Sequence, residues 1–254
     1  MENFSLIFYG IIQGLTEFLP ISSSGHTVLF SNIFGSRLPS VSIDIIIHLG
    51  SLMGLLYYFW RNYHTEKINL PNNKLILYIF CFSWIPILST GYIFREFLDT
   101  TARELNFIFI SFIVSGVFII LHLVRKIKIN YLVTVFLMSV FQALAVFPGI
   151  SRSGITIAIG LLFGLGVKNV ILFSFLMSVP VIILASLYEI LNIIGSSATF
   201  NANILVIFLS FIFATIFSFV GIKIMVWFSV FSNFKWFGFY NILLGIFIGI
   251  SILI

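Results

Sequence analysis

Charged residues are scarce in this chain. Of its 254 residues, 8% are Asp, Glu, Lys or Arg and 60% are hydrophobic, with a mean hydropathy of +1.18. Soluble domains carry about 25% charged residues, so this composition excludes a soluble enzyme. Because a helix needs about 20 apolar residues to cross a hydrocarbon core, the length allows about six to eight membrane elements and no second, soluble domain.

Cysteine and N-terminal positive charge are also nearly absent. The single Cys81 lies in an apolar run, which excludes a disulfide framework and a cysteine-based metal site. The first residues, MENFS, carry no basic residue, and the apolar stretch behind them is interrupted by Gln13, Glu17 and Pro20. A cleavable signal peptide lacks such interruptions, so we expect the N-terminus to be part of the fold.

Six long apolar segments are predicted to cross the membrane as helices. They cover residues 41–60, 75–94, 105–124, 170–194, 204–228 and 237–254. Two more apolar segments, 4–36 and 132–166, are each interrupted by proline, glycine and polar residues. Lipid offers irregular backbone no hydrogen-bond partners, so we expect both to be re-entrant pairs of half-helices buried in the protein. The fold class predicted is therefore all-α and integral to the membrane.

Basic residues gather on one side of this topology. Nine of the 13 lysines and arginines fall there: Arg61, Lys67, Lys74, Arg125, Lys126, Lys128, Lys168, Lys223 and Lys235. Cytoplasmic loops are enriched in Lys and Arg, so this side is predicted to be cytoplasmic and both termini to lie outside the cytoplasm. The opposite side holds Arg37, Arg95 and Arg103. Topology then explains the net charge of +5, and we expect membrane lipids and no nucleic acid as partners.

The two interrupted segments share a sequence. Residues 13–27, QGLTEFLPISSSGHT, align without gaps on residues 142–156, QALAVFPGISRSGIT, and eight of the fifteen positions are identical. Ordinary composition would give about one or two identities. Three predicted crossings separate the copies, an odd number, so the copies must enter the membrane from opposite faces. Such an inverted-topology repeat forms a site near the midplane, where the broken segments meet.

The predicted boundaries make the chain, 1–254, a single polytopic domain. Repeat one covers about 4–94, repeat two about 105–228, and 237–254 is an additional C-terminal span.

The copies differ where chemistry is expected. Copy one has Glu17, Ser23 and His26, and copy two has at the same places Val146, Arg152 and Ile155. A guanidinium at membrane depth costs about 2.5–3.5 kcal/mol, so Arg152 needs a partner. Its planar fork can bind phosphate oxygens bidentately. A structural ion pair with Glu17 is the alternative, and the repeat allows both.

Hydroxyl and backbone N–H groups near the two breaks could add donors to a phosphate site. They belong to Ser22, Ser24, Ser151, Ser153, Gly25 and Gly154. For the serines of copy one, the alternative is that they cap the returning half-helix.

Ser23 is the predicted nucleophile, because His26 follows one helical turn later and could take its proton or protonate the leaving group. Direct attack by His26 and attack by a metal-activated water stay open. Glu17 could accept a proton, or hold Mg²⁺ or Ca²⁺ together with phosphate oxygens of a substrate. Asp44 and His48, four residues apart, either support the site or form a structural pair.

Four motifs of the chain resemble, in the same order, those of the undecaprenyl-diphosphate phosphatase family, the bacitracin-resistance proteins. They are QGLTEFLPISSSGH at 13–26, IDIIIHLG at 43–50, FPGISRSGIT at 147–156 and FSFLMSVPVI at 173–182. The resemblance implies a phosphatase of the bacterial cytoplasmic (inner) membrane. It would remove the terminal phosphate of a polyprenyl diphosphate and so recycle the lipid carrier of cell-wall synthesis.

Residue by residue, the resemblance places the family's acidic motif on Gln13 and Glu17, its serine on Ser23, its histidine on His26 and its phosphate-binding arginine on Arg152. Many members have Glu where this chain has Gln13, so the motif that the resemblance assigns to the metal holds one carboxylate here, and the Gln13 carbonyl oxygen can still be a ligand. Inverted repeats also build transporters, so a polyprenyl-phosphate flippase or a small-anion transporter is the alternative function. The sequence leaves open whether the chain forms a homodimer.

Overall fold

The fold is described from a computed structural model, which covers residues 2–36, 38–63, 73–123, 127–194, 203–230 and 233–253. Regular structure in these residues is helical throughout. Four basic residues of the charge count fall outside them, namely Arg37, Lys67, Arg125 and Lys126. The all-α prediction is confirmed.

The helices follow the apolar segments of the sequence. In chain order they are α1 (Glu2–Glu17), α2 (Ser23–Phe34), α3 (Val41–Tyr63), α4 (Asn73–Phe82), α5 (Ile85–Ile93), α6 (Arg95–Thr100), α7 (Leu105–Leu121), α8 (Tyr131–Phe141), the 3₁₀ helix η1 (Gln142–Val146), α9 (Arg152–Leu162), α10 (Val167–Ile194), α11 (Ile204–Val230) and α12 (Lys235–Leu253). Five described segments are long and apolar enough to cross a membrane: Ser42–Asn62, Asn73–Ile93, Val167–Leu191, Ile204–Ser229 and Lys235–Leu253. The remaining predicted span, 105–124, forms α7, a shorter apolar helix of 17 residues. The chain is a multi-pass membrane protein.

The predicted span 75–94 is a broken helix instead of a continuous one. A turn at Ser83 and Trp84 separates α4 from α5. Pro86, the second residue of α5, has no N–H to donate, and its ring excludes the carbonyl four residues earlier, where α4 ends. The carbonyl of Ser83 at the break accepts a hydrogen bond from the side-chain amide of Gln142.

Both interrupted segments fold as helical hairpins, as predicted. The first hairpin is α1 and α2, joined by a turn over 18–22, and the second is α8, η1 and α9, with its turn over 147–151. The same cap begins both returning helices, because the Ser22 hydroxyl accepts from the backbone N–H of Gly25 at 3.3 Å and that of Ser151 from Gly154 at 3.1 Å. These serines therefore satisfy N–H groups that a helix start leaves unpaired.

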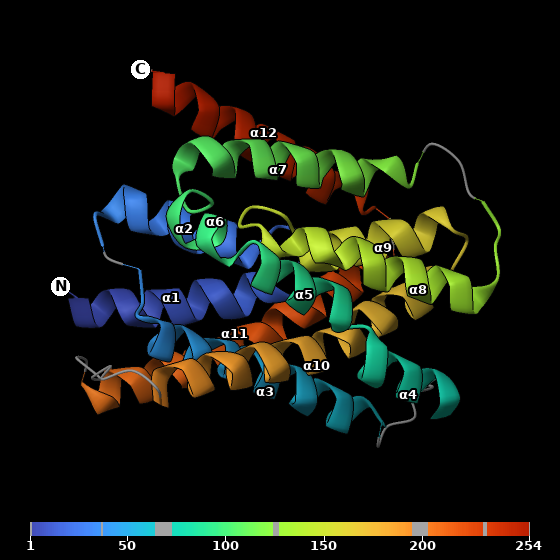
Figure 1. The fold of residues 1–254 in the computed structure, drawn as a ribbon, viewed down its shortest axis with the longest axis horizontal. Helices are drawn as coiled ribbons and strands as arrows, with labels where there is room; N and C mark the ends of the chain where they lie inside the picture. Colours follow the sequence, from blue (N-terminus) through green and yellow to red (C-terminus); the bar gives the residue numbers. More distant parts are fainter. Residues whose placement is uncertain are drawn as a thin grey trace.

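The hairpins enter the molecule from opposite ends and their turns meet near its middle (Figure 1). Between them in the chain, α3, the α4–α5 pair and α7 each run along the long axis, which makes the odd number of crossings that an inverted repeat requires. The chain termini lie at the same end of that axis (Figure 1). This arrangement confirms the inverted topology predicted from the sequence.

The offset of 129 residues also relates helices beyond the hairpins. It carries 105–121, the range of α7, onto 234–250, nearly the range of α12, and these two helices pack along each other. The contact is close, because a Cβ at Gly116 would lie 2.5 Å from the carbonyl oxygen of Gly238. The helix bounds therefore favour a boundary between the copies that lies after α7, with α12 as the counterpart of α7.

Helix α11 holds the first hairpin in place. It packs against both α1 and α3, and at the contacts a Cβ on Gly10 or Gly14 of α1 would come within 2.3 Å of an α11 carbonyl oxygen. On α3, Gly50 and Gly54 approach α11 in the same way, as small residues at a contact between membrane helices allow. The close packing of α1 against α11 therefore fixes the position of Glu17, the last residue of α1.

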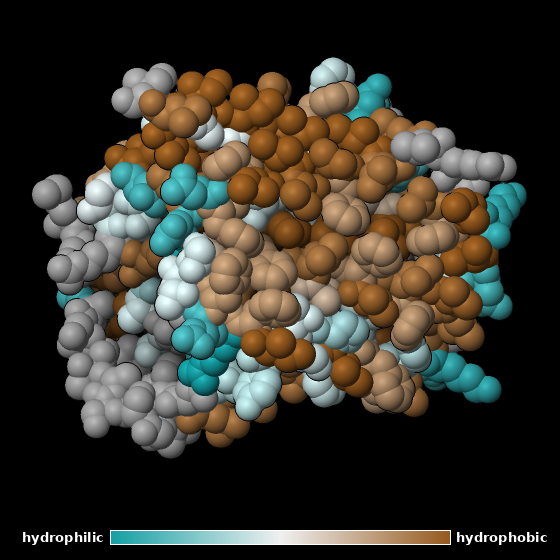
Figure 2. Space-filling view, turned by 45° about the horizontal axis from the view of Figure 1, so that its top comes forward, coloured by the Kyte–Doolittle hydropathy of each residue, from teal (hydrophilic) through white to brown (hydrophobic). Residues whose placement is uncertain are grey.

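The outer surface is banded. Figure 2 shows a wide hydrophobic region between hydrophilic residues gathered toward the two ends of the molecule. A membrane protein needs this pattern, with its apolar band in contact with lipid tails.

Candidate active site

Three side chains from the two hairpin turns meet in the middle of the protein. Glu17 is the last residue of α1, Ser23 the first of α2, and Arg152 the first of α9. The Arg152 Nη2 lies 2.8 Å from the Glu17 Oε1, and the Ser23 hydroxyl donates to the Glu17 Oε2 at 2.7 Å. Gln13, one turn before Glu17, donates its amide N–H to the same Oε2 at 2.6 Å. One carboxylate thus gathers a hydroxyl, an amide and a guanidinium.

The ion pair between Glu17 and Arg152 is nearly buried, with side-chain exposures of 8% and 11%. Its components come from opposite copies of the repeat, and Ser23 and Arg152 occupy equivalent positions, since both begin the returning half-helix. Sequence reasoning left open whether Arg152 pairs with Glu17 or serves a phosphate. The structure contains the pair, and Arg152 is also one of the residues that line a cavity.

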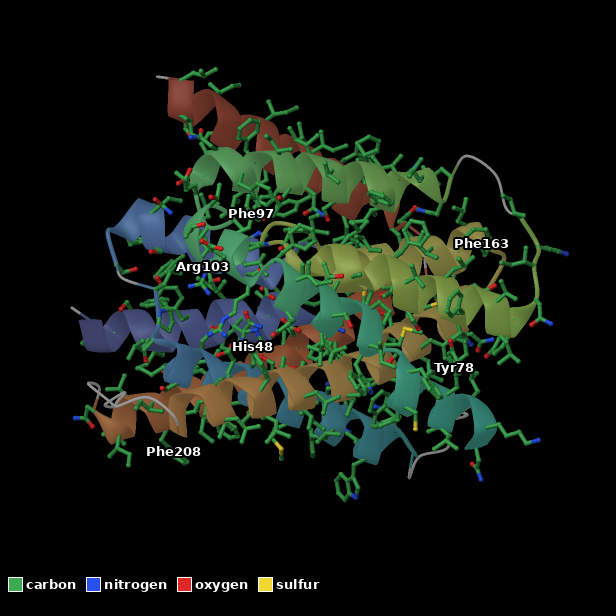
Figure 3. All side chains as sticks on the ribbon, in the orientation of Figure 1. His48, Tyr78, Phe97, Arg103, Phe163 and Phe208 are labelled. Atoms are coloured by element: carbon green, nitrogen blue, oxygen red, sulfur yellow. The ribbon has the colours of Figure 1, made fainter. Side chains whose placement is uncertain are left out.

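A cavity of about 920 Å³ opens beside this cluster. Its polar wall contains most of the predicted site residues, namely Gln13, Glu17, Ser22, Ser23, Ser24, Ser151 and Arg152. Its apolar wall comes from α5 and α10 and includes Ile87, Leu88, Val181, Ile182 and Ala185. Figure 3 labels two more lining residues, His48 near the middle of the molecule and Arg103 toward the end that carries the N-terminus.

Other predicted donors serve the backbone instead. The Ser153 hydroxyl donates to the carbonyl of Leu19 at 2.8 Å and so ties the two turns together. The N–H groups of Gly25 and Gly154 donate to the capping serines. Gly25 also allows the turns to approach, because a Cβ there would lie 2.9 Å from the Cα of Gly149.

Two residues that sequence reasoning missed satisfy the irregular backbone of the breaks. The Asn241 amide on α12 donates to the Pro20 carbonyl at 3.0 Å and toward the Ser115 hydroxyl at 3.4 Å. That hydroxyl, on α7, also accepts from the backbone N–H of Ser151 at 3.0 Å. Neither residue stands in a motif, so only their place in the fold could reveal this role.

His26 lies on a different side of α2 from the cavity, and it is not among the described residues that line the cavity. Its Nδ1 is 2.7 Å from the backbone carbonyl oxygen of Ser22, and its Nε2 is 2.7 Å from the hydroxyl of Tyr240 on α12. The ring stacks on Tyr240 and meets Phe112 edge to face. Both ring nitrogens are therefore hydrogen-bonded to groups other than Ser23, whose hydroxyl donates to Glu17.

Asp44 and His48 stand together on the α3 wall of the cavity. The His48 Nδ1 lies 2.9 Å from the Asp44 carbonyl oxygen and 3.6 Å from its Oδ1. Because a carbonyl can only accept, His48 carries its proton on Nδ1. Both residues line the same cavity as Glu17, so the pair belongs to the surroundings of the site.

Comparison with known proteins identifies the family. The family model described as "Bacitracin resistance protein BacA" matches residues 6–247. The chain belongs to the BacA family. It is 35% identical over 258 residues to the undecaprenyl-diphosphatase of Caldicellulosiruptor bescii, an alignment that covers 96% of each chain. It is also 35% identical over 266 residues to that of Prochlorococcus marinus subsp. pastoris, with 98% of each chain covered.

The donor set of this BacA-family site fits a divalent cation only if a substrate completes the coordination. Among the described residues, His, Cys, Asp and Glu form no group of three that could hold a metal ion. Glu17 is the carboxylate in direct contact with Ser23, and its charge is already balanced by Arg152. Mg²⁺ and Ca²⁺ prefer several oxygen ligands. A cation held by Glu17 and the Gln13 carbonyl oxygen would therefore need phosphate oxygens as its other ligands.

Proposed function

We propose that this protein hydrolyses undecaprenyl diphosphate to undecaprenyl phosphate and orthophosphate, and so recycles the lipid carrier of cell-wall synthesis. The observation that carries the proposal is the convergence of Ser23, Glu17 and Arg152 from two inverted hairpins on one intramembrane cavity. Membership of the BacA family and the relatives named undecaprenyl-diphosphatase support it.

The geometry suits attack by Ser23. Its hydroxyl already donates to Glu17, so the carboxylate can take the proton as the oxygen attacks the terminal phosphorus. The bond from that phosphorus to the bridging oxygen breaks, and the lipid monophosphate leaves. Water then attacks the phosphoserine, Ser23 recovers its proton from Glu17, and the proton of the water leaves through the cavity with orthophosphate.

Positive groups at the cavity would stabilise the phosphate. The guanidinium of Arg152 can turn two N–H groups toward equatorial oxygens. Ser23 and Arg152 begin α2 and α9, so the positive ends of two helix dipoles also meet there. A divalent cation held by Glu17, Gln13 and the substrate would neutralise further charge on the diphosphate.

The apolar wall of the cavity suits the lipid part of the substrate. Ile87 and Leu88 of α5 face the same cavity as Val181 and Ile182 of α10, beside the polar cluster. The diphosphate can therefore reach Ser23 while the first prenyl units stay in apolar surroundings. A soluble phosphate ester offers nothing to this wall, which favours a prenyl diphosphate as substrate.

We place the protein in the bacterial cytoplasmic membrane with both termini outside the cytoplasm. The described basic residues Arg61, Lys74, Lys128, Lys168 and Lys235 lie in helix ends and connections at the end opposite the termini. Cytoplasmic segments are enriched in Lys and Arg, which supports this orientation. Arg95 and Arg103, which line the cavity, then lie toward the extracytoplasmic side.

Labelling of single cysteines tests the orientation. In a Cys81→Ser background, Thr100→Cys should react with an impermeant maleimide added to intact cells, because α6 ends on the outer side, whereas Asn130→Cys should react only after permeabilisation. Both positions are exposed in the structure. Labelling of Asn130→Cys in intact cells, with Thr100→Cys protected, would reverse the proposed orientation.

Phosphate release by the purified protein tests the function. We expect orthophosphate and undecaprenyl phosphate in equal amounts from undecaprenyl diphosphate in detergent. The alternative, a flippase or anion transporter, is favoured by one observation, the meeting of the turns of two inverted hairpins near the middle of the molecule. Binding of the lipid without orthophosphate release would support that alternative and contradict hydrolysis.

The proposed cation site predicts the effect of Gln13→Glu. A second carboxylate beside Glu17 should lower the Mg²⁺ concentration that gives half-maximal turnover by about tenfold, because ligand charge raises affinity for hard cations. The measurement is a Mg²⁺ titration of phosphate release after treatment with a chelator. An unchanged midpoint of the Mg²⁺ titration, or full activity of the native enzyme in the chelator alone, would show that Gln13 and Glu17 do not bind the cation.

A further inference from the structure

We infer that His26 and Tyr240 act together as positioning residues, which hold the turn before Ser23 in a rarely adopted backbone conformation and so direct the Ser23 hydroxyl at the reacting phosphate. The inference deepens the proposed phosphatase function and rests on it. It assigns a role to Tyr240, and it gives His26 a role in place of proton transfer to or from Ser23.

The turn before Ser23 contains an unusual residue. Ser22 has φ +65° and is the one non-glycine residue with positive φ in the described part of the chain. Such a conformation is unfavourable for an L-residue with a Cβ, and it persists where the surroundings hold it. Ser22 directly precedes Ser23, so its conformation sets where the Ser23 hydroxyl points.

His26 is the group that holds this turn. The Ser22 carbonyl accepts two hydrogen bonds, from the backbone N–H of His26 at 3.2 Å and from its ring Nδ1 at 2.7 Å. Because a carbonyl oxygen cannot donate, the ring proton is on Nδ1. In the neutral ring, Nε2 then accepts the Tyr240 hydroxyl at 2.7 Å. The stacked Tyr240 ring, 5.8 Å away and tilted by 5°, and the edge-on Phe112 keep the imidazole in this plane.

The second hairpin is an internal comparison that lacks this arrangement. The equivalent of Ser22 is Ser151, which also caps its helix and also accepts the backbone N–H four residues on, at 2.9 Å. Where copy one has His26, copy two has Ile155, whose side chain cannot donate. In that copy the serine is relaxed, with φ −81°. The positive φ therefore accompanies the histidine and not the capping serine or the hairpin.

The two copies also differ in the length of the side chain that directly follows the turn. In copy one the strained turn precedes a hydroxyl that must lie within 2.7 Å of Glu17. In copy two the relaxed turn precedes Arg152, whose long side chain reaches Glu17 from across the interface. A short side chain needs its backbone placed more accurately than a long one, which gives a physical reason for a positioning pair in the first copy alone.

A double-mutant cycle tests the inference, because glycine adopts positive φ without the penalty of a Cβ. His26→Ile, which reproduces copy two, should lower kcat about 100-fold in the enzyme that keeps Ser22 but less than about tenfold in a Ser22→Gly background. Ser151→Gly is the matched control in the other copy, and there the His26→Ile loss should stay about 100-fold. A general base or acid at His26 predicts equal losses in all three backgrounds, which would overturn the proposal.

Tyr240→Phe is the milder variant, since it removes one hydroxyl at a half-exposed position. We expect kcat to fall about tenfold with KM within twofold, and no further loss when the change is added to His26→Ile. Independent, multiplying losses would contradict a shared role.

Native enzyme in the same assay separates this inference from the proposed function. Failure of the native enzyme to release phosphate from undecaprenyl diphosphate would refute the function. An active native enzyme that shows an equal His26→Ile loss in the Ser22→Gly background would refute this inference alone.

Discussion

Replacing Ser23 with alanine is expected to reduce phosphate release by about three orders of magnitude or more, because the attacking oxygen would be lost while Glu17 and Arg152 remain paired. The measurement is turnover of undecaprenyl diphosphate by the purified, folded variant. Retention of more than a few per cent of native turnover would contradict Ser23 as nucleophile.

The chemistry of the intermediate separates the three routes of attack. Enzyme quenched during turnover of substrate labelled on its terminal phosphate should carry an acid-stable, base-labile phosphoserine. Attack by His26 would leave an acid-labile phosphohistidine, and attack by water would leave no labelled protein. Ser24→Ala is the matched control, because Ser24 lines the same cavity one residue away and this variant should still form the phosphoserine.

Arg152→Lys is expected to be nearly inactive, with turnover reduced about 10²- to 10³-fold, although it folds. Lysine keeps the positive charge beside Glu17 but loses the planar fork that can bind two phosphate oxygens in the transition state. Turnover is measured beside the melting temperature in detergent. Near-normal turnover would reduce Arg152 to a structural or general electrostatic residue.

The lysine variant is preferred to alanine because of the burial of the ion pair. Removing one partner of a buried pair leaves an uncompensated charge and typically costs about 3–5 kcal/mol of stability. A loss of turnover in Arg152→Ala could therefore come either from unfolding or from the missing guanidinium. Arg95→Lys controls for the exchange of arginine for lysine itself, since Arg95 is an exposed residue that donates a hydrogen bond to the Tyr188 hydroxyl, and turnover should change less than about threefold.

The repeat in the sequence was enough to predict the framework of the site. Interrupted apolar segments cannot stay irregular in lipid, so they had to fold as buried hairpins, and an odd number of crossings had to place them in opposite directions. These two constraints placed Arg152 and Glu17 at one site, with an ion pair as one of two alternatives, and the structure contains that pair across 135 residues. The broken α4–α5 helix was not predicted, although Pro86 was its visible signal.

Only the tertiary structure determined the hydrogen-bond partners of the side chains in the site. Spacing along one helix placed His26 a turn from Ser23 and favoured a bond between them, but helix periodicity says nothing about what packs on each face. The hydroxyl of Tyr240, 214 residues away on α12, is hydrogen-bonded to Nε2 of His26, and the Ser22 carbonyl is hydrogen-bonded to its Nδ1. Ser23 then turns to Glu17. Local sequence determines which groups are available, whereas the packing of distant helices determines which of them meet, because side-chain hydrogen bonds depend on ångström-scale placement that no periodicity contains.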